Sequence, residues 1–236
     1  MNGFLEFARG PLFVATFLFM VLGLSRHVLL RTLAVVSALR RTPKKDVPWK
    51  KVFRKTAGWV VPVQHVYRAA PVLSVASILF HIAILVVPVF LADHVFLWAR
   101  GVGITLPALG AGTADFLSML AILSGTFLFL FRVVNRTARD MSGFPDYALL
   151  VVVVVPFLTG WFAAHPESSP LAYPTMMLLH VLSAELTFVL LPFTKLAHVV
   201  LYFFDRISTD IFWRFVPGAG DKVAEALRGT TKGAEA

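Results

Sequence analysis

Long apolar runs alternate with short polar segments along the whole chain. Five of these runs are long enough to cross a hydrocarbon core of about 30 Å, which takes about 20 helical residues. They predict transmembrane helices near residues 10–30, 71–92, 113–133, 147–164 and 174–203. The last run is longer than one span needs, so we expect its end to protrude or its helix to tilt. The predicted fold is an all-α membrane protein, a bundle of five transmembrane helices.

The helix pattern also predicts the organisation of the chain. We expect one transmembrane domain over residues 1–217 and a polar, small-residue-rich tail over residues 218–236. The segment before the first apolar run lacks a clear cationic region and a small-residue cleavage site, so we expect a retained first helix and not a signal peptide. No internal repeat of the kind found in many transporters is evident.

Basic residues gather in the segments on one side of the predicted helices. Ten lie between residues 31 and 68, where Asp46 is the single acid, and Arg132, Arg136 and Arg139 follow the third helix. The two intervening loops on the opposite side offer only Arg100. This asymmetry predicts an outside N-terminus and a cytoplasmic C-terminus in the inner membrane of a bacterial or archaeal cell. The net charge of +9 therefore reflects topology and attraction to membrane lipid, not nucleic-acid binding.

Composition narrows the possible chemistry. Hydrophobic residues make up 58% of the chain and charged residues 15%, which is the membrane class and not that of a soluble domain. There is no cysteine. The chain alone therefore forms no disulfide, holds no iron–sulfur cluster through thiolates and attaches no c-type haem. Any iron–sulfur chemistry must belong to a partner subunit.

The histidines suggest a different cofactor. Four of the seven fall within or at the ends of the second and fifth predicted helices, two on each: His81, His94, His180 and His198. Neutral imidazole is an ordinary axial ligand of haem iron, and facing helices of a bundle hold a flat macrocycle between them. His180 and His198 are 18 residues apart, about five turns and about 27 Å on one ideal helix, so both would point to one face.

Antiparallel helices predict which histidines pair. His81 should face His198 on the inner side, and His94 should face His180 on the outer side, giving two b-type haems. On an ideal helix the 13 residues from His81 to His94 leave the two rings about 140° apart, and Pro88 between them can kink or rewind the helix. A membrane histidine also serves packing or an interhelical hydrogen bond, but four in this arrangement favour ligation.

The remaining histidines have no partner at this spacing. We expect structural or headgroup roles for His27, at the inner end of the first helix, and for His65, in an interfacial segment. His165 lies in an outer loop, where it belongs either to a quinone pocket or to a solvated turn.

Four other ionisable residues each have two interpretations. Glu185 inside the fifth helix is either a proton-transfer group in quinol oxidation or an interhelical hydrogen-bond donor. Lys195, near the face of His198, and Arg68, just before the second helix, either pair with an inner haem propionate or extend to the membrane surface. Asp93 beside His94 either orients that ring and accepts a quinol proton or is a solvated helix-end acid.

Two stretches resemble a known family. Phe80-His81-Ile82-Ala83-Ile84-Leu85 followed by His94, and His180 to His198 with Leu191-Pro192-Phe193-Thr194-Lys195-Leu196-Ala197-His198, are similar to the gamma subunit of respiratory nitrate reductases and to related dihaem cytochrome b subunits of heterodisulfide-reductase-like complexes. The resemblance covers nearly the whole chain. It implies a five-helix anchor in which His81, His94, His180 and His198 are the axial ligands. The wide His81–His94 spacing favours a relative that serves another catalytic subunit.

The resemblance also implies a function. The protein would be the quinol-oxidising, electron-transfer subunit of a multisubunit oxidoreductase in the respiratory chain, passing electrons from quinol near the outer haem to an iron–sulfur subunit and a catalytic subunit on the cytoplasmic side. The alternatives are a proton-coupled transporter and a non-redox membrane anchor or assembly subunit.

Overall fold

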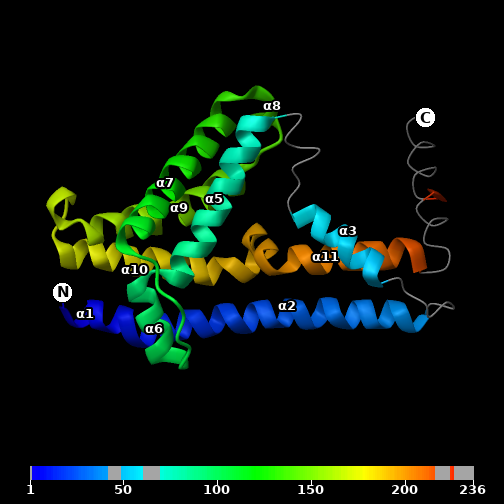
Figure 1. Ribbon diagram of the computed structural model, residues 1–236, viewed down its shortest axis with the longest axis horizontal. Helices are drawn as coiled ribbons and strands as arrows, with labels where there is room; N and C mark the ends of the chain where they lie inside the picture. Colours follow the sequence, from blue (N-terminus) through cyan, green and yellow to red (C-terminus); the bar gives the residue numbers. More distant parts are fainter. Residues whose placement is uncertain (1, 42–48, 61–69, 216–223, 226–236) are drawn as a thin grey trace. The chain divides into compact units, whose positions relative to one another are not determined.

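The computed structural model describes residues 2–41, 49–60, 70–215 and 224–225, and every regular element in these ranges is a helix (Figure 1). Five helical segments of the described part are long and apolar enough to cross a membrane, namely Gly3–Ser37, Pro71–Phe90, Ala111–Val134, Phe144–Ala164 and Tyr173–Phe193. The chain is therefore an all-α, multi-pass membrane protein, as predicted. Arg68, His65 and nearly all of the predicted tail lie outside the described residues.

The chain forms two compact units, where the sequence predicted one domain over residues 1–217. Unit 1 consists of Met1–Met20 and Val63–Leu191, and unit 2 consists of Val21–Pro62 and Pro192–Ala236. Each unit is described by itself below.

Unit 1 contains most of the apolar helices. The chain begins with α1 (Asn2–Phe7), a π-helical turn η1 (Ala8–Leu12) and the first part of α2 (Phe13–Arg41). The second segment of unit 1, Val63–Leu191, contains six helices and one 3-10 turn in its described part. They are α5 (Pro71–Phe90), α6 (Ala92–Val102), α7 (Ala111–Val134), α8 (Arg136–Asp140), α9 (Phe144–Ala164), the 3-10 turn η2 (Pro166–Ser168) and α10 (Tyr173–Leu190). Helix α7 packs between α5 and α9, and α9 packs in turn on α10 (Figure 1).

Small residues allow these helices to approach closely. On α7, Ala114, Ala121, Ser124 and Gly125 are buried. A methyl group added at Gly125 would lie 2.5 Å from Cγ2 of Val154 on α9 and 2.9 Å from Cε2 of Phe80 on α5. Lipid offers apolar side chains as good an environment as protein does, so close backbone packing of this kind is what holds membrane helices together.

Gly125→Ala is therefore expected to destabilise unit 1 by about 1–3 kcal/mol, the usual cost of overpacking. Gly112→Ala, also on α7, is the matched control because nothing lies within 4 Å of its added methyl group. The control should be neutral or slightly stabilising, since alanine is the better helix former. Thermal unfolding of the purified protein in detergent compares the two. Equal melting temperatures would contradict the close packing described at Gly125.

The second predicted helix ends earlier than expected. Helix α5 ends at Phe90, and Leu91 is extended, with φ −60° and ψ 134°, before α6 begins at Ala92. The predicted range 71–92 is thus too long, and His94 lies on α6, not at the end of α5. Because of this break, the angle of about 140° calculated for an unbroken helix from His81 to His94 does not apply.

The fifth predicted helix is also interrupted, so the prediction of one helix over residues 174–203 is wrong. Helix α10 ends at Leu190 and is followed by two 3-10 turns, η3 (Leu191–Phe193) and η4 (Lys195–Ala197), before α11 (His198–Phe215) begins. Pro192 has no N–H to continue the helix. Thr194 is extended, and its hydroxyl accepts a hydrogen bond from the N–H of Leu196 at 3.3 Å. The 18 residues from His180 to His198 therefore do not form one continuous helix.

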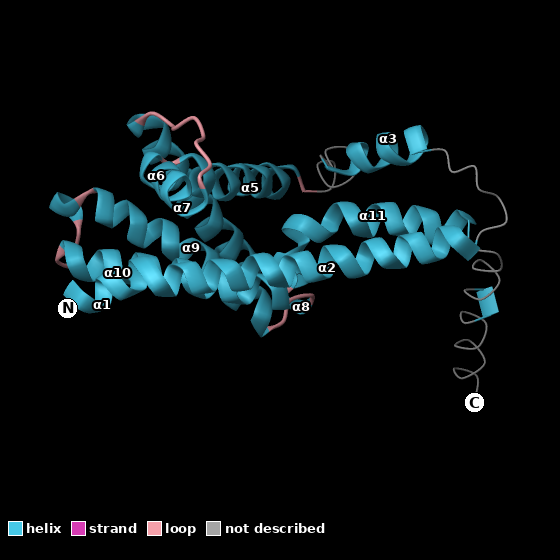
Figure 2. Cartoon of the chain, turned by 90° about the horizontal axis from the view of Figure 1, so that it is seen from below, coloured by secondary structure: helices cyan, strands magenta, loops and turns pink. Residues whose placement is uncertain are grey.

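Unit 2 joins the later part of α2 to α11. The imidazole Nε2 of His27 donates to the carbonyl oxygen of Pro192 at 2.8 Å, and Arg31 forms an ion pair with Asp205 at 3.2 Å. A methyl group at Gly23 would lie 2.6 Å from Cβ of Pro192, so the two segments are in close contact there. Figure 2 shows α2 beside α11, and the short helix α3 (Trp49–Val60) packs on α11.

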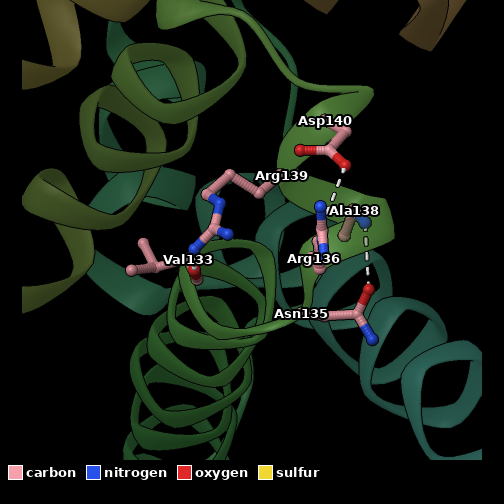
Figure 3. Close-up of polar contacts among 6 residues, drawn as sticks. All are labelled: Val133, Asn135, Arg136, Ala138, Arg139 and Asp140. Carbon is pink, nitrogen blue, oxygen red and sulfur yellow. Dashed lines mark hydrogen bonds and ion pairs between the residues drawn. The ribbon is translucent and has the colours of Figure 1, made fainter.

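The connection between α7 and α9 is held by polar contacts. Asn135 caps α8, its side-chain oxygen accepting from the N–H of Ala138 at 2.9 Å (Figure 3). Arg132 donates to the carbonyl of Asp146 at 2.8 Å, and Arg139 donates to the carbonyl of Val133 at 3.4 Å. Arg132 and Arg139, two of the three arginines that follow the third predicted helix, thus also fix the ends of these helices.

Candidate functional site

Two of the four predicted ligands lie together in unit 1. The imidazoles of His94 on α6 and His180 on α10 have ring centres 6.1 Å apart, and their planes differ by 11°. The predicted outer pair is therefore brought together across 86 residues of sequence. The extended backbone at Leu91 makes this possible, because it ends α5 and lets α6 run in a different direction.

Each ring of this pair is fixed by its Nδ1 atom. Nδ1 of His94 donates to the carbonyl oxygen of Pro88 at 3.1 Å, and Nδ1 of His180 donates to the carbonyl oxygen of Pro156 at 2.8 Å. A carbonyl oxygen only accepts, so Nδ1 carries the proton in both rings. In a neutral imidazole the other nitrogen, Nε2, then keeps its lone pair, which is the atom and the tautomer that a metal ion requires.

The sequence produces both hydrogen bonds locally. The carbonyl of Pro88 belongs to the last turn of α5, where carbonyl oxygens have no partner within the helix, and His94 caps it. On α9, Gly160 lies four residues after Pro156 and presents no side chain. A methyl group there would lie 2.8 Å from Cε1 and 2.9 Å from Nδ1 of His180. Gly160 therefore leaves the carbonyl of Pro156 open to the histidine.

Electrostatics favours a neutral ring at His94, which lies outside the spanning segments. Burial lowers the pKa of His94, and the nearby charge of His180 lowers this pKa further. A neutral ring near pH 7 is the form that binds a metal ion.

The distance of 6.1 Å between the two ring centres matches that of two axial ligands on opposite sides of one metal ion. An imidazole nitrogen binds a metal ion at about 2 Å, and the ring centre lies about 1 Å farther, so two rings on opposite sides of one ion have centres about 6 Å apart. An offset-stacked pair of neutral rings spans a similar distance. The two Nδ1 hydrogen bonds favour ligation, because they direct the basic nitrogen of both rings away from the protein acceptors.

The predicted inner pair is divided between the units. His81 lies on α5 in unit 1, where its Nδ1 donates to the carbonyl of Ser77 at 2.7 Å. His198 begins α11 in unit 2, where its Nδ1 donates to the carbonyl of Lys195 at 2.7 Å. Both imidazoles are exposed within their own unit. The pattern of an Nδ1 atom held by a carbonyl is thus common to all four predicted ligands.

Of the other two described histidines, His27 uses the opposite ring nitrogen, whereas His165 shares the Nδ1 hydrogen bond of the four predicted ligands. His27 donates through Nε2, the nitrogen that haem ligation would need, to the carbonyl of Pro192. His165 hydrogen-bonds through Nδ1 to the carbonyl of Trp161 at 2.9 Å, and its Nε2 lies 3.6 Å from a carboxylate oxygen of Asp115 on α7. Both have structural contacts, as the sequence predicted for His27, and His165 links the end of α9 to the start of α7.

Of the three further predicted site residues, only Asp93, which adjoins His94, is described in the same unit as the His94–His180 pair. Lys195 is exposed on η4 in unit 2, and Arg68 is outside the described residues. Asp93 is exposed in the first turn of α6, where a carboxylate is favoured by the helix dipole.

Glu185 is the most unusual ionisable residue of unit 1. Its side chain on α10 is buried, with 3% of the residue exposed, and neither carboxylate oxygen has a hydrogen-bond partner in the described part of the chain. The interhelical hydrogen bond that the sequence left open as one interpretation is therefore not observed there.

Two contributors to the site were not predicted from the sequence. Gly160 is needed for the approach of His180, but a glycine in an apolar helix gives no sign of what packs on it. Arg9 on the π-helical turn η1 lies close enough to act electrostatically on His180, and its only sequence signal is its position beside the first apolar run. An Arg in this place offers a cation to an anionic group near the histidine pair.

Other features of the described residues lie elsewhere. A shallow apolar groove of about 200 Å³ between α7 and α9 is lined by Gly125, Thr126, Phe129, Leu150, Val151, Val154 and Val155, with no histidine among them. No group of three or more potential metal ligands is found in the ranges that the structure covers. Axial ligation of haem requires two.

Comparison with known proteins gives one relative. A protein of Nitratidesulfovibrio vulgaris, strain Hildenborough, is 33% identical to this chain over 204 residues, which is 85% of this chain and 89% of the relative. No protein-family model matches the sequence, and no solved structure matches it. The similarity extends over almost the full length of both proteins. The chain therefore belongs to the same protein family as this protein of Nitratidesulfovibrio vulgaris.

Proposed function

We propose that this protein is the membrane cytochrome b subunit of a quinone-linked respiratory complex. The observation that carries the proposal is the His94–His180 pair, with parallel rings 6.1 Å apart and both Nδ1 atoms donating to backbone carbonyls. Packing alone does not require two rings 6.1 Å apart to share one tautomer, whereas axial ligation does.

The protein's own groups would hold the cofactor as follows. His94 and His180 supply the axial nitrogens of the outer haem, while the carbonyls of Pro88 and Pro156 keep each ring in the required tautomer and orientation. Arg9 offers a cation for an anionic edge of the cofactor. Without cysteine, attachment is non-covalent. When bound, a b-type haem supplies reversible one-electron chemistry, which these side chains alone lack.

We extend the proposal to a second haem on His81 and His198. In both residues Nδ1 donates to a carbonyl, as it does in the outer pair and in His165, so the support for this second pair is the placement of two histidines on each of the second and fifth predicted helices. Lys195 next to His198, together with Arg68, would meet the propionates of this inner haem. The excess of basic residues between residues 31 and 68 supports an orientation with the N-terminus outside and the inner haem toward the cytoplasm of a bacterial or archaeal cell.

The proposed haems also imply a quinol substrate and protein partners for this subunit. Quinol would be oxidised near the outer haem, with Asp93 at the outer end of α6 as a candidate proton acceptor. Because the chain has no cysteine, an electron arriving at the inner side needs an iron–sulfur subunit, and a catalytic subunit beyond it, as acceptors. The resemblance to nitrate reductase gamma subunits supports this arrangement.

Reduction by quinol tests the proposal. The purified protein is oxidised, mixed anaerobically with a soluble menaquinol analogue and followed by optical spectroscopy. We expect the sharp absorption bands of reduced b-type haem to appear, because the ligand pair would place a haem within reach of the quinol. A transporter or a non-redox anchor shows no such bands. A protein without haem absorption before and after addition of dithionite would refute the proposal.

A further inference from the structure

Glu185 is a buried carboxyl group without a protein partner inside a membrane-spanning helix. Only 3% of the residue is exposed, and both carboxylate oxygens lack hydrogen bonds from the described residues. An unpaired ionisable group in such a place is costly and contributes nothing to packing that an apolar residue would not contribute better. The group is therefore a candidate for a function that uses its proton.

The packing around α10 offers Glu185 no fixed counter-charge. Helix α9 carries no titratable side chain from Ala148 to Ala164, and Asp146 and Tyr147 lie in its first turn. On α1 and η1, Glu6 and Arg9 are both exposed. Helix α10 itself carries Tyr173 and His180, and α6 carries Asp93, His94 and Arg100. None of these groups hydrogen-bonds to the Glu185 carboxyl group.

Aromatic rings shield the same region. Phe188, one helical turn after Glu185, contacts Phe13 and Phe17 of α2, each with ring centres 6.0 Å apart. Phe17 in turn contacts Trp98 of α6 at 5.2 Å, and the indole N–H of Trp98 is also buried without a partner in the described part. A charge in such an apolar environment is screened little, so it acts strongly on other charges nearby.

Glu185 lies on the same helix as His180, a proposed ligand of the outer haem. It follows His180 by five residues, which is about 7.5 Å along the axis of α10. An electron arriving on that haem adds one negative charge at short range in a medium of low dielectric constant. A carboxylate at Glu185 would repel that charge, and a proton bound to the carboxylate would cancel the repulsion.

We infer that Glu185 is a proton-binding site that takes up one proton when the outer haem gains an electron and releases it when the electron leaves. The inference rests on the proposed function. One electron, supplied by quinol, and one proton arrive together, the carboxylate becomes a carboxylic acid, and the net charge of the site does not change. Glu185 thereby couples proton movement to electron transfer inside the membrane.

Potentiometric titration of the haems at several pH values tests the inference. In the wild-type protein the midpoint potential of the outer haem, identified as the component missing from His180→Ala, should fall as pH rises. The slope should approach the one-proton, one-electron limit of about 59 mV per pH unit, the value for a tenfold change in a one-electron couple. Glu185→Gln should retain both haems and lose this slope, and Glu185→Asp should restore it.

A matched control and a second measurement separate the outcomes. Glu6→Gln removes an exposed carboxylate from α1 and should leave the slope unchanged. Redox-difference infrared spectroscopy of the wild type should show a carboxylic acid C=O band that shifts in deuterium oxide and is absent from Glu185→Gln. An unchanged slope in Glu185→Gln with both haems present, or the absence of such a band in the wild type, would overturn the inference alone. A wild-type protein without haem would overturn the proposed function as well.

Discussion

His180→Ala is expected to remove one of two haems and leave the other in place. The substitution deletes one of the two axial nitrogens of the outer haem, together with the hydrogen bond to Pro156 that orients it. A b-type haem has no covalent tether, so loss of one ligand releases it or leaves it weakly bound. The haem-to-protein ratio, measured by optical and redox titration of the purified variant, should fall by about half.

His165→Ala is the matched control for this prediction. His165 is also a partly buried histidine of unit 1, but its ring contacts Trp161 and Asp115 and not another imidazole. The control should keep both haems with unchanged potentials. If His180→Ala retained both haems with normal spectra, His180 would not be a ligand, and the 6.1 Å pair would be a packing contact.

Gly160→Ala should disturb the same haem without touching a ligand. The added methyl group would lie 2.8 Å from Cε1 of His180, closer than carbon atoms approach one another, so the ring must move. Its movement breaks the hydrogen bond from Nδ1 to the carbonyl of Pro156, and the loss of a hydrogen bond that orients a ligand weakens metal binding by about 10–100-fold. We expect a lowered occupancy of the outer haem and a shifted electron paramagnetic resonance signal for it.

Gly112→Ala makes the same chemical change where nothing lies within 4 Å, and it should leave both haems unaltered. Unchanged haem signals in Gly160→Ala would show that His180 does not depend on its contact with α9. Loss of both haems together would instead indicate that the bundle had unfolded, which thermal unfolding of the same sample distinguishes.

The sequence predicted the existence of the apolar helices better than their ends. Length and hydropathy alone locate the five segments, because a membrane span must be about 20 apolar residues long. Two of the predicted helices, 71–92 and 174–203, include positions at which the helix is interrupted. Leu91 and Thr194 are ordinary residues, and their extended backbone depends on packing and capping that only the folded chain provides.

The outer histidine pair was predicted for a partly different reason from the one that the structure gives. Antiparallel helices suggested that His94 faces His180, although an ideal helix turned His94 away from the face of His81. The break at Leu91 removes that conflict. The pairing of His81 with His198 stays a prediction, because these residues belong to different units.

Hydrogen bonds of the histidine rings were beyond sequence reasoning. The assignment of Nδ1 to the carbonyls of Pro88 and Pro156 depends on hydrogen-bond distances of 3.1 and 2.8 Å between separate helices, which residue spacing does not determine. The same holds for Glu185, whose position within a span was evident while its lack of a partner was not. The parallel contact between two imidazoles is what distinguishes His94 and His180 from His27 and His165.

The haem content of the purified protein tests the central claim most directly. A pyridine haemochrome assay, combined with a protein determination and extraction by acidified organic solvent, measures both the number of haems and their attachment. The account predicts two b-type haems per chain, both extracted because no cysteine is available to tether them. A protein that contains no haem, or haem that stays with the polypeptide after extraction, would contradict it.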